Sequence, residues 1–494
     1  MKYHKRFDLG RVIAIVTVAT LLGADSLRAQ FAEDVLRFSS FNLGIGARSA
    51  AMGNTSVGIA DDFSSLFTNP AGLTSLRSFE FSVGLSNAGY TNDATFFGTK
   101  TNATDRITNL NNFGLVYPVP TKRGSLSFAF GFARVANFGT TASFSGFNPN
   151  NSIVESLTPD VNLNGMSADD RERLLDANIP FQTYLADIDS ARGRLIPHVL
   201  GNVQQDGSVR ETGGINSWSF GGALELSKGL SLGVGIDILS GSYGYDRLYI
   251  ETDSRNFYNG AVPDDFAKFR YESTINSELS GYNVLVGLMY RKQGKFKLGL
   301  TVRTPTYYKI EEDFADIGTA WFDNGDHFDL RNPGSTSYEI QTPYIFSAGG
   351  SIQATDWLLL AGDAEITDWT QMEFNTDNAD LLEENRFIRS AFKSTTALRG
   401  GAEVTLFDLG LRLRGGIVYN PSPYKNDRPE LDQKYYTAGI GAAIDENVSL
   451  NASLAFGTWR TFRDNYYLYG FDAPSRTSES VNTSLVNVTL TYRF

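Results

Sequence analysis

Residues 486–494, VNVTLTYRF, alternate strictly between apolar and polar side chains. Successive side chains of a β-strand point to opposite faces, so this stretch predicts a strand with one apolar and one polar face. Residues 448–457 and 126–132 repeat the pattern, mostly with large apolar residues at every second position. Such strands occur in soluble sandwiches as well as in membrane barrels, so the alternation alone does not separate these two classes.

The connections between the strands do separate them. Fourteen candidate strands lie near residues 78–90, 110–118, 124–137, 214–227, 230–250, 269–291, 296–311, 337–354, 357–370, 395–406, 409–419, 434–444, 447–463 and 481–494. From the second strand onward, short connections such as 228–229 alternate with long ones, of which 138–213 is the longest. Short turns on one rim and long loops on the other are typical of outer-membrane barrels. The sequence therefore predicts an all-β fold, a 14-stranded antiparallel transmembrane β-barrel over residues 78–494, with a soluble all-β domain as the alternative.

The composition restricts the possible functions. The 494 residues include 43 Lys+Arg, 55 Asp+Glu and no Cys. The lack of cysteine excludes a disulfide framework and cysteine-ligated metals. The net charge of −12 argues against a nucleic-acid partner. After residue 30, no apolar run reaches the length of about 18 residues that indicates a membrane helix.

Residues 1–29 have the organisation of a secretory signal. Four basic residues precede the apolar run 12–22, and Ala29 lies at a plausible cleavage point. We predict cleavage after Ala29, with a retained membrane anchor as the alternative. Removal of this segment takes away five basic and two acidic residues, which moves the net charge from −12 to −15.

Residues 30–77 lack the alternation of the strands. Glycines interrupt two short stretches of helical character at 47–52 and 60–67. A compact segment ahead of a barrel predicts an N-terminal plug that fills the lumen. We expect its first apolar residues to form a hydrophobic pocket for a ligand inside the barrel. These residues are Phe31, Leu36, Phe38 and Phe41.

The run IADDFSSLFTNPAGL at 59–73 resembles the N-terminal hatch of the FadL/TodX family of long-chain fatty acid and hydrocarbon outer-membrane transport proteins. The residues that carry the resemblance are Asp61, Asp62, Asn69, Pro70 and Ala71. For the last three, a generic turn is the alternative, because Asn followed by Pro favours turn initiation. The resemblance implies that the hatch plugs the barrel. It also implies that apolar substrates leave sideways through an inward kink in the third strand.

The third predicted strand ends in a sequence similar to that kink, namely Ala136, Asn137, Phe138 and Gly139. The resemblance implies a lateral opening in the barrel wall at these residues, whereas an ordinary strand end is the alternative. Gly139 would supply the backbone freedom for an inward bend, and the small Ala136 would leave space beside it.

The long loop 138–213 contains a second apolar pattern. Ser167 stands ahead of two aspartates, which predicts a capped helix start. Beyond it, apolar residues recur at helical spacing at Phe181, Tyr184, Leu185 and Ile188. The simpler interpretation is a helix that packs on its own loop. The functional hypothesis is an external capture site for an apolar ligand.

Strand alternation also places charged residues in the lumen. They are Asp363, Glu365, Arg399, Glu403, Arg412 and Arg414, on three neighbouring predicted strands. The simpler interpretation is a salt-bridge network that anchors the plug, and the alternative is a binding site for a substrate carboxylate.

Enzyme chemistry has little support in these residues. Of the three histidines, only His198 and His327 follow the predicted signal, and both lie in predicted external loops. The acidic residues around Asp326 lack the spacing of a calcium loop. We therefore expect no catalytic residue, no cofactor and no metal.

The function predicted from these features is a monomeric channel of the bacterial outer membrane. It would take up hydrophobic small molecules such as fatty acids or hydrocarbons by passive diffusion and release them into the outer-membrane lipid. The alternative is a plugged barrel that acts as a partner of an assembly or secretion machine.

Overall fold

The fold is a computed structural model. It describes residues 24–41, 44–260, 265–292, 295–376, 378–468, 470 and 474–494, without the side chains of 24–31 and 380. None of the helices within these ranges combines the length and the apolar character needed to cross a membrane.

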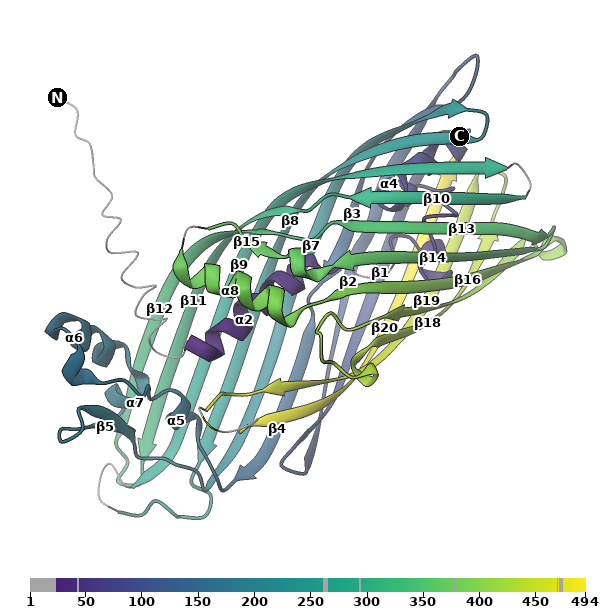
Figure 1. The fold of residues 1–494 in the computed structure, drawn as a ribbon. Coiled ribbons are helices and arrows are strands. Elements are labelled where there is room, and N and C mark those ends of the chain that lie inside the picture. Colours follow the sequence, from purple (N-terminus) through teal and green to yellow (C-terminus); the bar gives the residue numbers. More distant parts are fainter. Residues whose placement is uncertain are drawn as a thin grey trace, which may run out of the picture.

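Most of the chain lies in one antiparallel sheet of eighteen strand segments (Figure 1). They are β1 (Glu80–Phe96), β2 (Thr99–Val119), β3 (Leu126–Asn137), β4 (Thr140–Asn148), β7 (Val203–Ser227), β8 (Leu230–Thr252), β9 (Phe266–Lys292), β10 (Phe296–Arg303), β11 (Tyr307–Phe322), β12 (His327–Gln341), β13 (Ile345–Thr355), β14 (Leu358–Asp368), β15 (Glu373–Phe374), β16 (Ser394–Leu406), β17 (Leu411–Asn420), β18 (Gln433–Ala443), β19 (Val448–Asp464) and β20 (Arg476–Arg493). The segments β4, β11, β13 and β15 each continue the preceding strand after a short break, so the barrel has fourteen strands.

The first and last strands close the barrel. β1 pairs with β20 from Glu80↔Arg493 to Thr95↔Ser478 and with β2 on its other side. This arrangement confirms the predicted 14-stranded antiparallel barrel.

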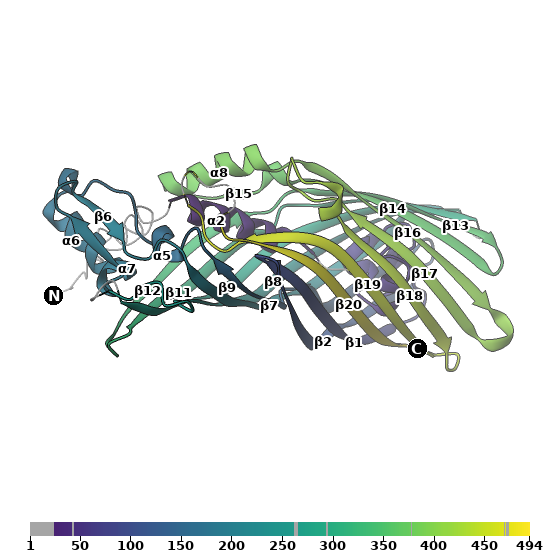
Figure 2. The same cartoon turned by 90° about the horizontal axis from the view of Figure 1, so that it is seen from below.

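The remaining elements are short. The helices are α2 (Ala24–Ser39), α3 (Ala47–Ala51), α4 (Ser65–Thr68), α5 (Ile153–Ser156), α6 (Ala168–Ala177), α7 (Ile179–Gln182) and α8 (Ala379–Ala391), with 3-10 turns η1 (Pro70–Ser75), η2 (Leu163–Gly165), η3 (Trp369–Gln371), η4 (Phe407–Leu409) and η5 (Pro429–Leu431). A separate hairpin joins β5 (Ala186–Asp189) and β6 (Arg194–Pro197). Figure 2 shows α2 inside the ring of strands and near α8, which lies at the barrel margin.

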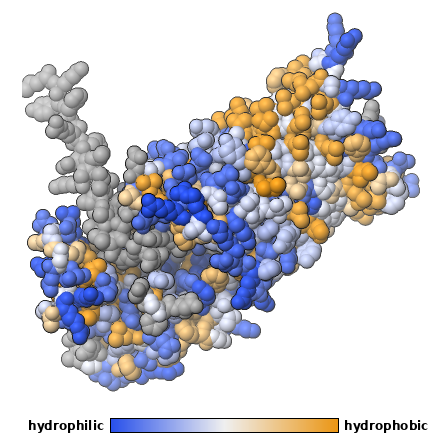
Figure 3. Space-filling view, viewed as in Figure 1, coloured by the Kyte–Doolittle hydropathy of each residue, from blue (hydrophilic) through white to orange (hydrophobic). Residues whose placement is uncertain are grey.

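The alternation of the last strand follows the two faces of the wall. Val486, Val488 and Leu490 are about 40% exposed on the outer face, whereas Asn487 and Thr489 are buried inside. On the face shown in Figure 3, hydrophobic residues gather on the half that carries β10 and β13, whereas the other half, with α6 and α8, is more hydrophilic and has only scattered hydrophobic patches. An apolar outer band is expected of a barrel in a lipid bilayer.

Residues 44–76, called here the N-terminal segment, contact the inner faces of strands all around the ring. Backbone N–H groups of Ala47 and Gly53 donate to threonine hydroxyls of β20 and β18 at 2.9 and 3.0 Å. The wall presents glycines to it, and a side chain at any of them would overlap atoms of the segment. They are Gly114, Gly131, Gly221, Gly233, Gly287, Gly299, Gly401, Gly416 and Gly439. The missing side chains therefore let this segment pack closely against the wall.

The largest loop is shorter than the sequence suggested. β4 and β7 pair across residues 140–148 and 203–211, so the loop between these strands spans residues 149–202. Within it, Ser167 caps α6 by accepting a hydrogen bond from the Asp170 N–H at 3.1 Å, which confirms the predicted helix start.

Candidate functional site

A cavity of about 880 Å³ lies in the lumen between α2, the N-terminal segment and the wall. Leu36 and Phe41 line this cavity, whereas Phe38 is buried beside it and is 1% exposed. The side chain of Phe31 lies outside the described residues. Two of the four residues predicted to form the pocket therefore face the cavity.

The wall is interrupted next to this cavity. β2 and β3 pair only as far as Asn112↔Ala133, and β4 pairs with β7 alone. Among the described residues, β2 therefore has no backbone ladder partner on this side along 99–111, and we call this interruption of the ladder the wall gap. Two side chains of β2 bridge it: Thr101 donates to the carbonyl oxygen of Ser143 on β4, and Asp105 pairs with Arg210 of β7 at 3.7 Å. Ile107 on one side and Asn137 and Gly139 on the other line the cavity. The cavity thus reaches the wall at the residues that were predicted to form a kink.

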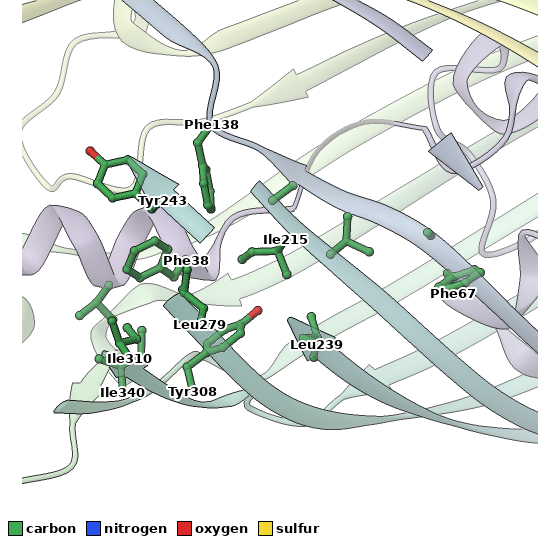
Figure 4. Packing of buried hydrophobic residues seen from close by; sticks show 14 of the residues in the cluster. Phe38, Phe67, Phe138, Ile215, Leu239, Tyr243, Leu279, Tyr308, Ile310 and Ile340 are labelled. Carbon is green, nitrogen blue, oxygen red and sulfur yellow. The ribbon is translucent and has the colours of Figure 1, made fainter. Parts of the chain in front are cut away.

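β3 ends at Asn137 and β4 begins at Thr140, and we call residues 136–139 at this break the bend. An aromatic triad joins α2 to the bend. The ring of Phe38 lies 5.7 Å from that of Phe138 and 5.9 Å from that of Tyr243, and the last two are 5.7 Å apart. Figure 4 shows the three rings converging where α2 passes the bend. Edge-on contacts of this kind contribute roughly 0.5–1.5 kcal/mol each beyond the buried area. Phe138 therefore points inward and fixes α2 against the wall.

A polar network reinforces the same contact. Arg37 pairs with Asp34 within α2 and places its Nη2 3.3 Å from Oε1 of Glu211 on β7. Glu211 also accepts hydrogen bonds from the hydroxyls of Thr140 and Tyr243, at 2.5 and 3.0 Å. Burial raises the pKa of Asp34 to about 7, although the neighbouring Arg37 opposes the shift. Glu211 thereby connects α2 to the first residue of β4, beyond the bend.

The residues of the bend have different environments. Ala136 and Phe138 are buried, whereas Asn137 and Gly139 are partly accessible from the cavity. Gly139 lies in the break between β3 and β4, and its φ is not positive, so the bend uses no left-handed backbone angle at this residue. A register shift between Arg134 and Ala136 bends the strand instead.

The unusual backbone lies on the strand opposite the bend. Gly213 of β7 has a φ of 100°, a value that side chains with a Cβ rarely adopt. A Cβ at this position would also overlap the backbone of Ser242 on β8. The glycine that permits the distortion is therefore on β7.

Asn69 fixes a corner of the N-terminal segment to the wall. Its Nδ2 donates to the carbonyl oxygens of Val57 and Leu288 at 2.9 and 3.3 Å, and its Oδ1 accepts from the Ala71 N–H at 3.2 Å. Pro70 begins the 3-10 turn η1, a position that needs no N–H donor. Asn69, Pro70 and Ala71 therefore act together at the turn that leads towards β1.

The two aspartates of the hatch-like motif have separate roles. Asp61 accepts from Arg48 and, at 2.9 Å, from Nζ of Lys297 on β10. Burial acts to raise the pKa of Asp61, but these two cations outweigh it and hold the pKa below its usual value. Asp62 accepts from the Ser64 N–H at 2.9 Å, next to the start of α4. Asp61 thus anchors the segment to the wall, and Asp62 shapes it locally.

Some of the charged residues that were predicted to lie in the lumen also contact the N-terminal segment. Glu403 accepts from Nε of Arg414 at 2.7 Å and from Nε of Arg48 at 3.2 Å. Asp363 accepts from the backbone N–H of Val57 at 2.8 Å. Arg412 is exposed. These contacts have the geometry expected of a salt-bridge network that anchors the plug, which is the simpler interpretation of the lumen charges.

The other predicted charges line the cavity. Arg399 makes a two-pronged contact with Glu365, at 3.0 and 2.8 Å. Sequence reasoning missed Arg303, which pairs with Asp237 and donates to the carbonyl oxygen of Phe67 at 2.7 Å. The alternation of apolar residues at 298, 300 and 302 on β10 indicates that Arg303 points inward, so the signal was present.

The external helix face does not form. α7 ends at Gln182, and Tyr184 has a φ of 58°. Ile188 belongs instead to the β5–β6 hairpin, and it packs with Phe181 against a small cluster within the loop. Leu185 is fully buried in a different cluster. The prediction of one helical face from Phe181 to Ile188 is therefore wrong, because a turn and a hairpin replace the helix after its first turn.

Removing the apolar side chains that line the cavity should weaken ligand binding. Full burial of a Leu or Phe side chain is worth roughly 1.5–3 kcal/mol, and these two are already partly buried. We therefore expect the double variant Leu36→Ala, Phe41→Ala to bind a fluorescent fatty acid roughly tenfold more weakly in a titration of the purified protein. Leu382→Ala, on the exposed surface of α8, is the control. Equal affinities of the double variant and the wild type would place the ligand elsewhere.

Sequence comparison agrees with this geometry. Residues 214–494 match the model of the outer membrane protein transport protein family (OMPP1/FadL/TodX). The chain belongs to this family. The family consists of transport channels for hydrophobic substrates, and this membership together with the fold identifies a bacterial outer-membrane β-barrel. No curated protein has a significantly matching sequence.

Solved structures share the fold at low sequence identity. The toluene transporter TodX of P. putida is 14% identical with a TM-score of 0.54, and the alignment covers 91% of this chain and 98% of TodX. A FadL homologue of Pseudomonas aeruginosa is 12% identical with a TM-score of 0.54, covering 92% and 99%. The toluene transporter TbuX of Ralstonia pickettii is 14% identical with a TM-score of 0.52, covering 93% and 100%. These similarities establish the common fold.

Proposed function

We propose that this channel admits hydrophobic molecules by passive diffusion and releases them sideways through the wall gap into the membrane. The observation that carries the proposal is the lumen cavity, which extends to the strand edges where the β2–β3 ladder stops. A hydrophobic molecule that entered the aqueous periplasm would expose its surface again, at about 25 cal/mol per Å². Exit through the wall avoids that cost.

In this proposal the N-terminal residues close the lumen. Residues 1–29 are the secretory signal, 30–77 the plug and 78–494 the barrel. The contacts of Asn69, Asp61 and Arg48 with wall strands support a plug that stays in place while a ligand passes beside it. The triad of Phe38, Phe138 and Tyr243 supports a role for α2 as the inner cover of the wall gap.

The substrates that we propose are fatty acids or hydrocarbons, carried by a monomer. Toluene transporters and a monoaromatic hydrocarbon channel, CymD, are among the structures that share the fold. The partly apolar cavity, with Leu36 and Phe41 on one side, supports an apolar ligand. These observations favour a channel over a partner protein of a secretion machine.

Uptake by cells tests the proposal. Cells that lack other members of the family and express this chain should take up a labelled long-chain fatty acid or an aromatic hydrocarbon several-fold faster than cells with an empty vector. Uptake of a hydrophilic disaccharide should stay the same. If none of the apolar probes enters faster, the proposed function is wrong.

A further inference from the structure

The short turns lie at the end of the barrel opposite α5 to α7 (Figure 1), and their charge differs from one side of the ring to the other. The turns after β2, β7 and β9 carry five exposed cationic side chains, which we call the basic arc: Lys122, Arg123, Lys228, Lys292 and Lys295. The turns after β13, β16 and β18 instead carry four exposed carboxylates, those of Asp356, Asp408, Asp445 and Glu446. The described residues of the first three turns include no Asp or Glu, although the whole chain has a net charge of −12. The basic arc is therefore a local concentration of positive charge on a negative protein.

The three turns of the basic arc lie next to one another on the rim. The Glu225 N–H on β7 donates to the carbonyl oxygen of Ser125 at the first turn, at 2.8 Å. The Arg291 N–H on β9 donates to the carbonyl oxygen of Gly229 at the second turn, at 2.7 Å. Each pair of turns is separated by two strand spacings, which amounts to roughly 10 Å. The basic arc thus spans roughly 20 Å of the rim, which suits a row of charged head groups better than one small ion.

Apolar side chains face outward directly beside these turns. Tyr117 precedes the first turn, Leu226 lies two residues before Lys228, and Tyr290 lies two residues before Lys292, and all three are exposed. Aromatic residues at the edge of an apolar band mark the head-group level of a barrel, and short turns mark its periplasmic rim. The basic arc therefore lies at the level of the phosphate groups of the periplasmic leaflet.

The cations of the basic arc are not used within the protein. None of the five forms an ion pair with a carboxylate of the described residues. Lys309 and Arg270, on the outer half of the wall, pair in contrast with Glu311 and Glu272 at 2.6 and 2.8 Å. The acidic residue closest to the basic arc in the sequence is Glu225, and its Oε1 accepts from the Gly229 N–H at 2.8 Å. The five charges are therefore available to an anionic partner.

We propose that the basic arc binds the phosphate groups of anionic phospholipids in the periplasmic leaflet, and that it gathers these lipids below the strands β2, β3 and β7 that border the wall gap. Lysine and arginine at a membrane surface attract anionic lipids, and Arg123 can donate two N–H bonds to one phosphate. The adjacent apolar band brings lipid to these turns, which favours a lipid over a soluble acidic protein. The acidic turns across the ring repel the same head groups, so the lipids collect on one side. This inference needs the membrane barrel alone and holds for any transported substrate.

Lipid binding to the purified full-length protein tests the inference. Native mass spectrometry in detergent counts the bound molecules during titration with a phosphatidylglycerol or with a phosphatidylcholine of the same acyl chains. The basic-arc variant carries five substitutions: Lys122→Gln, Arg123→Gln, Lys228→Gln, Lys292→Gln and Lys295→Gln. It should need at least about tenfold more phosphatidylglycerol for half occupancy than the wild type, whereas its binding of phosphatidylcholine should change less than twofold. Added salt should weaken the binding of phosphatidylglycerol by the wild type in the same direction.

A matched control removes the same number of exposed cations from the opposite half of the barrel. It carries Lys100→Gln, Arg171→Gln, Arg173→Gln, Arg331→Gln and Arg428→Gln. This variant should bind phosphatidylglycerol like the wild type, and heat-modifiability checks that each variant is folded. Equal loss in both variants would assign lipid binding to net charge and overturn the inference. Unchanged binding in the basic-arc variant would overturn it as well, and would leave the basic arc to a soluble acidic partner. Failure of substrate uptake would refute the proposed function and would not change these lipid titrations.

Discussion

Replacing Gly139 by Arg is expected to abolish uptake of hydrophobic substrates while the barrel still folds. A Cβ at Gly139 would meet only Oδ1 of Asn137 at 3.6 Å and Cγ2 of Ile107 at 3.9 Å, which are ordinary contacts. The longer Arg side chain would extend towards Ile107, across the wall gap, and would close it with a charged group. Initial rates of labelled fatty acid uptake, with heat-modifiability as the check of folding, measure the effect.

The controls separate blockage from distortion. Gly139→Ala adds only a methyl group and should keep most of the uptake, and Gly165→Arg adds the same charge in the external loop and should keep all of it. Ala136 is a less informative position, because it is 1% exposed within the core and an Arg there would disturb the packing around it. Wild-type uptake by the Gly139→Arg variant would exclude lateral exit between β2 and β3.

The barrel could be predicted from the sequence wherever its outer face meets lipid. The pattern in 486–494 is clear because the residues that face the bilayer must be apolar. Residues 99–109, TKTNATDRITN, form the outer half of β2 without any such pattern. Strand ends that extend beyond the bilayer need no apolar face, so their sequences lack the alternation and are predicted as loops. For the same reason, the sequence pattern places β4 and the start of β7 in the predicted loop 138–213.

Part of the candidate site could be predicted from the alternation of side chains along a strand, and part could not. The inward orientation of Arg303 can be predicted from the alternation of side chains along β10. The contact between Arg37 and Glu211 joins residues 174 positions apart, and no local pattern indicates it. The bend itself depends on Gly213, which lies on the neighbouring strand and far from Phe138 in sequence. The resemblance of residues 136–139 to the family's kink indicated the bend. The contacts that place α2 against it, such as that of Phe38 with Phe138, join residues far apart in the sequence, so no local pattern predicts them.

Deleting residues 30–77 is expected to convert a closed barrel into an open pore. The N-terminal segment contacts the inner faces of strands around the ring, and wall glycines accommodate it in place of side chains that would fill the lumen. Without the segment, those glycines leave a wide water-accessible path. The buried Glu80 and Asp363 would each lose a backbone N–H donor, of Phe63 and Val57, but water entering the lumen can replace both bonds. The strand ladder itself does not involve the segment, so the barrel should remain folded.

Conductance in planar bilayers measures this opening. We expect the deletion variant to conduct at least about an order of magnitude more than the wild type, as expected for an unplugged lumen. A shorter deletion, of 32–41, removes the part of α2 that packs at the wall gap but keeps residues 44–76. This variant should stay nearly closed to ions, because the anchors through Asn69, Asp61 and Arg48 remain. If the full deletion is as closed as the wild type, the lumen must be sealed by the external loops, and the N-terminal segment cannot be the plug.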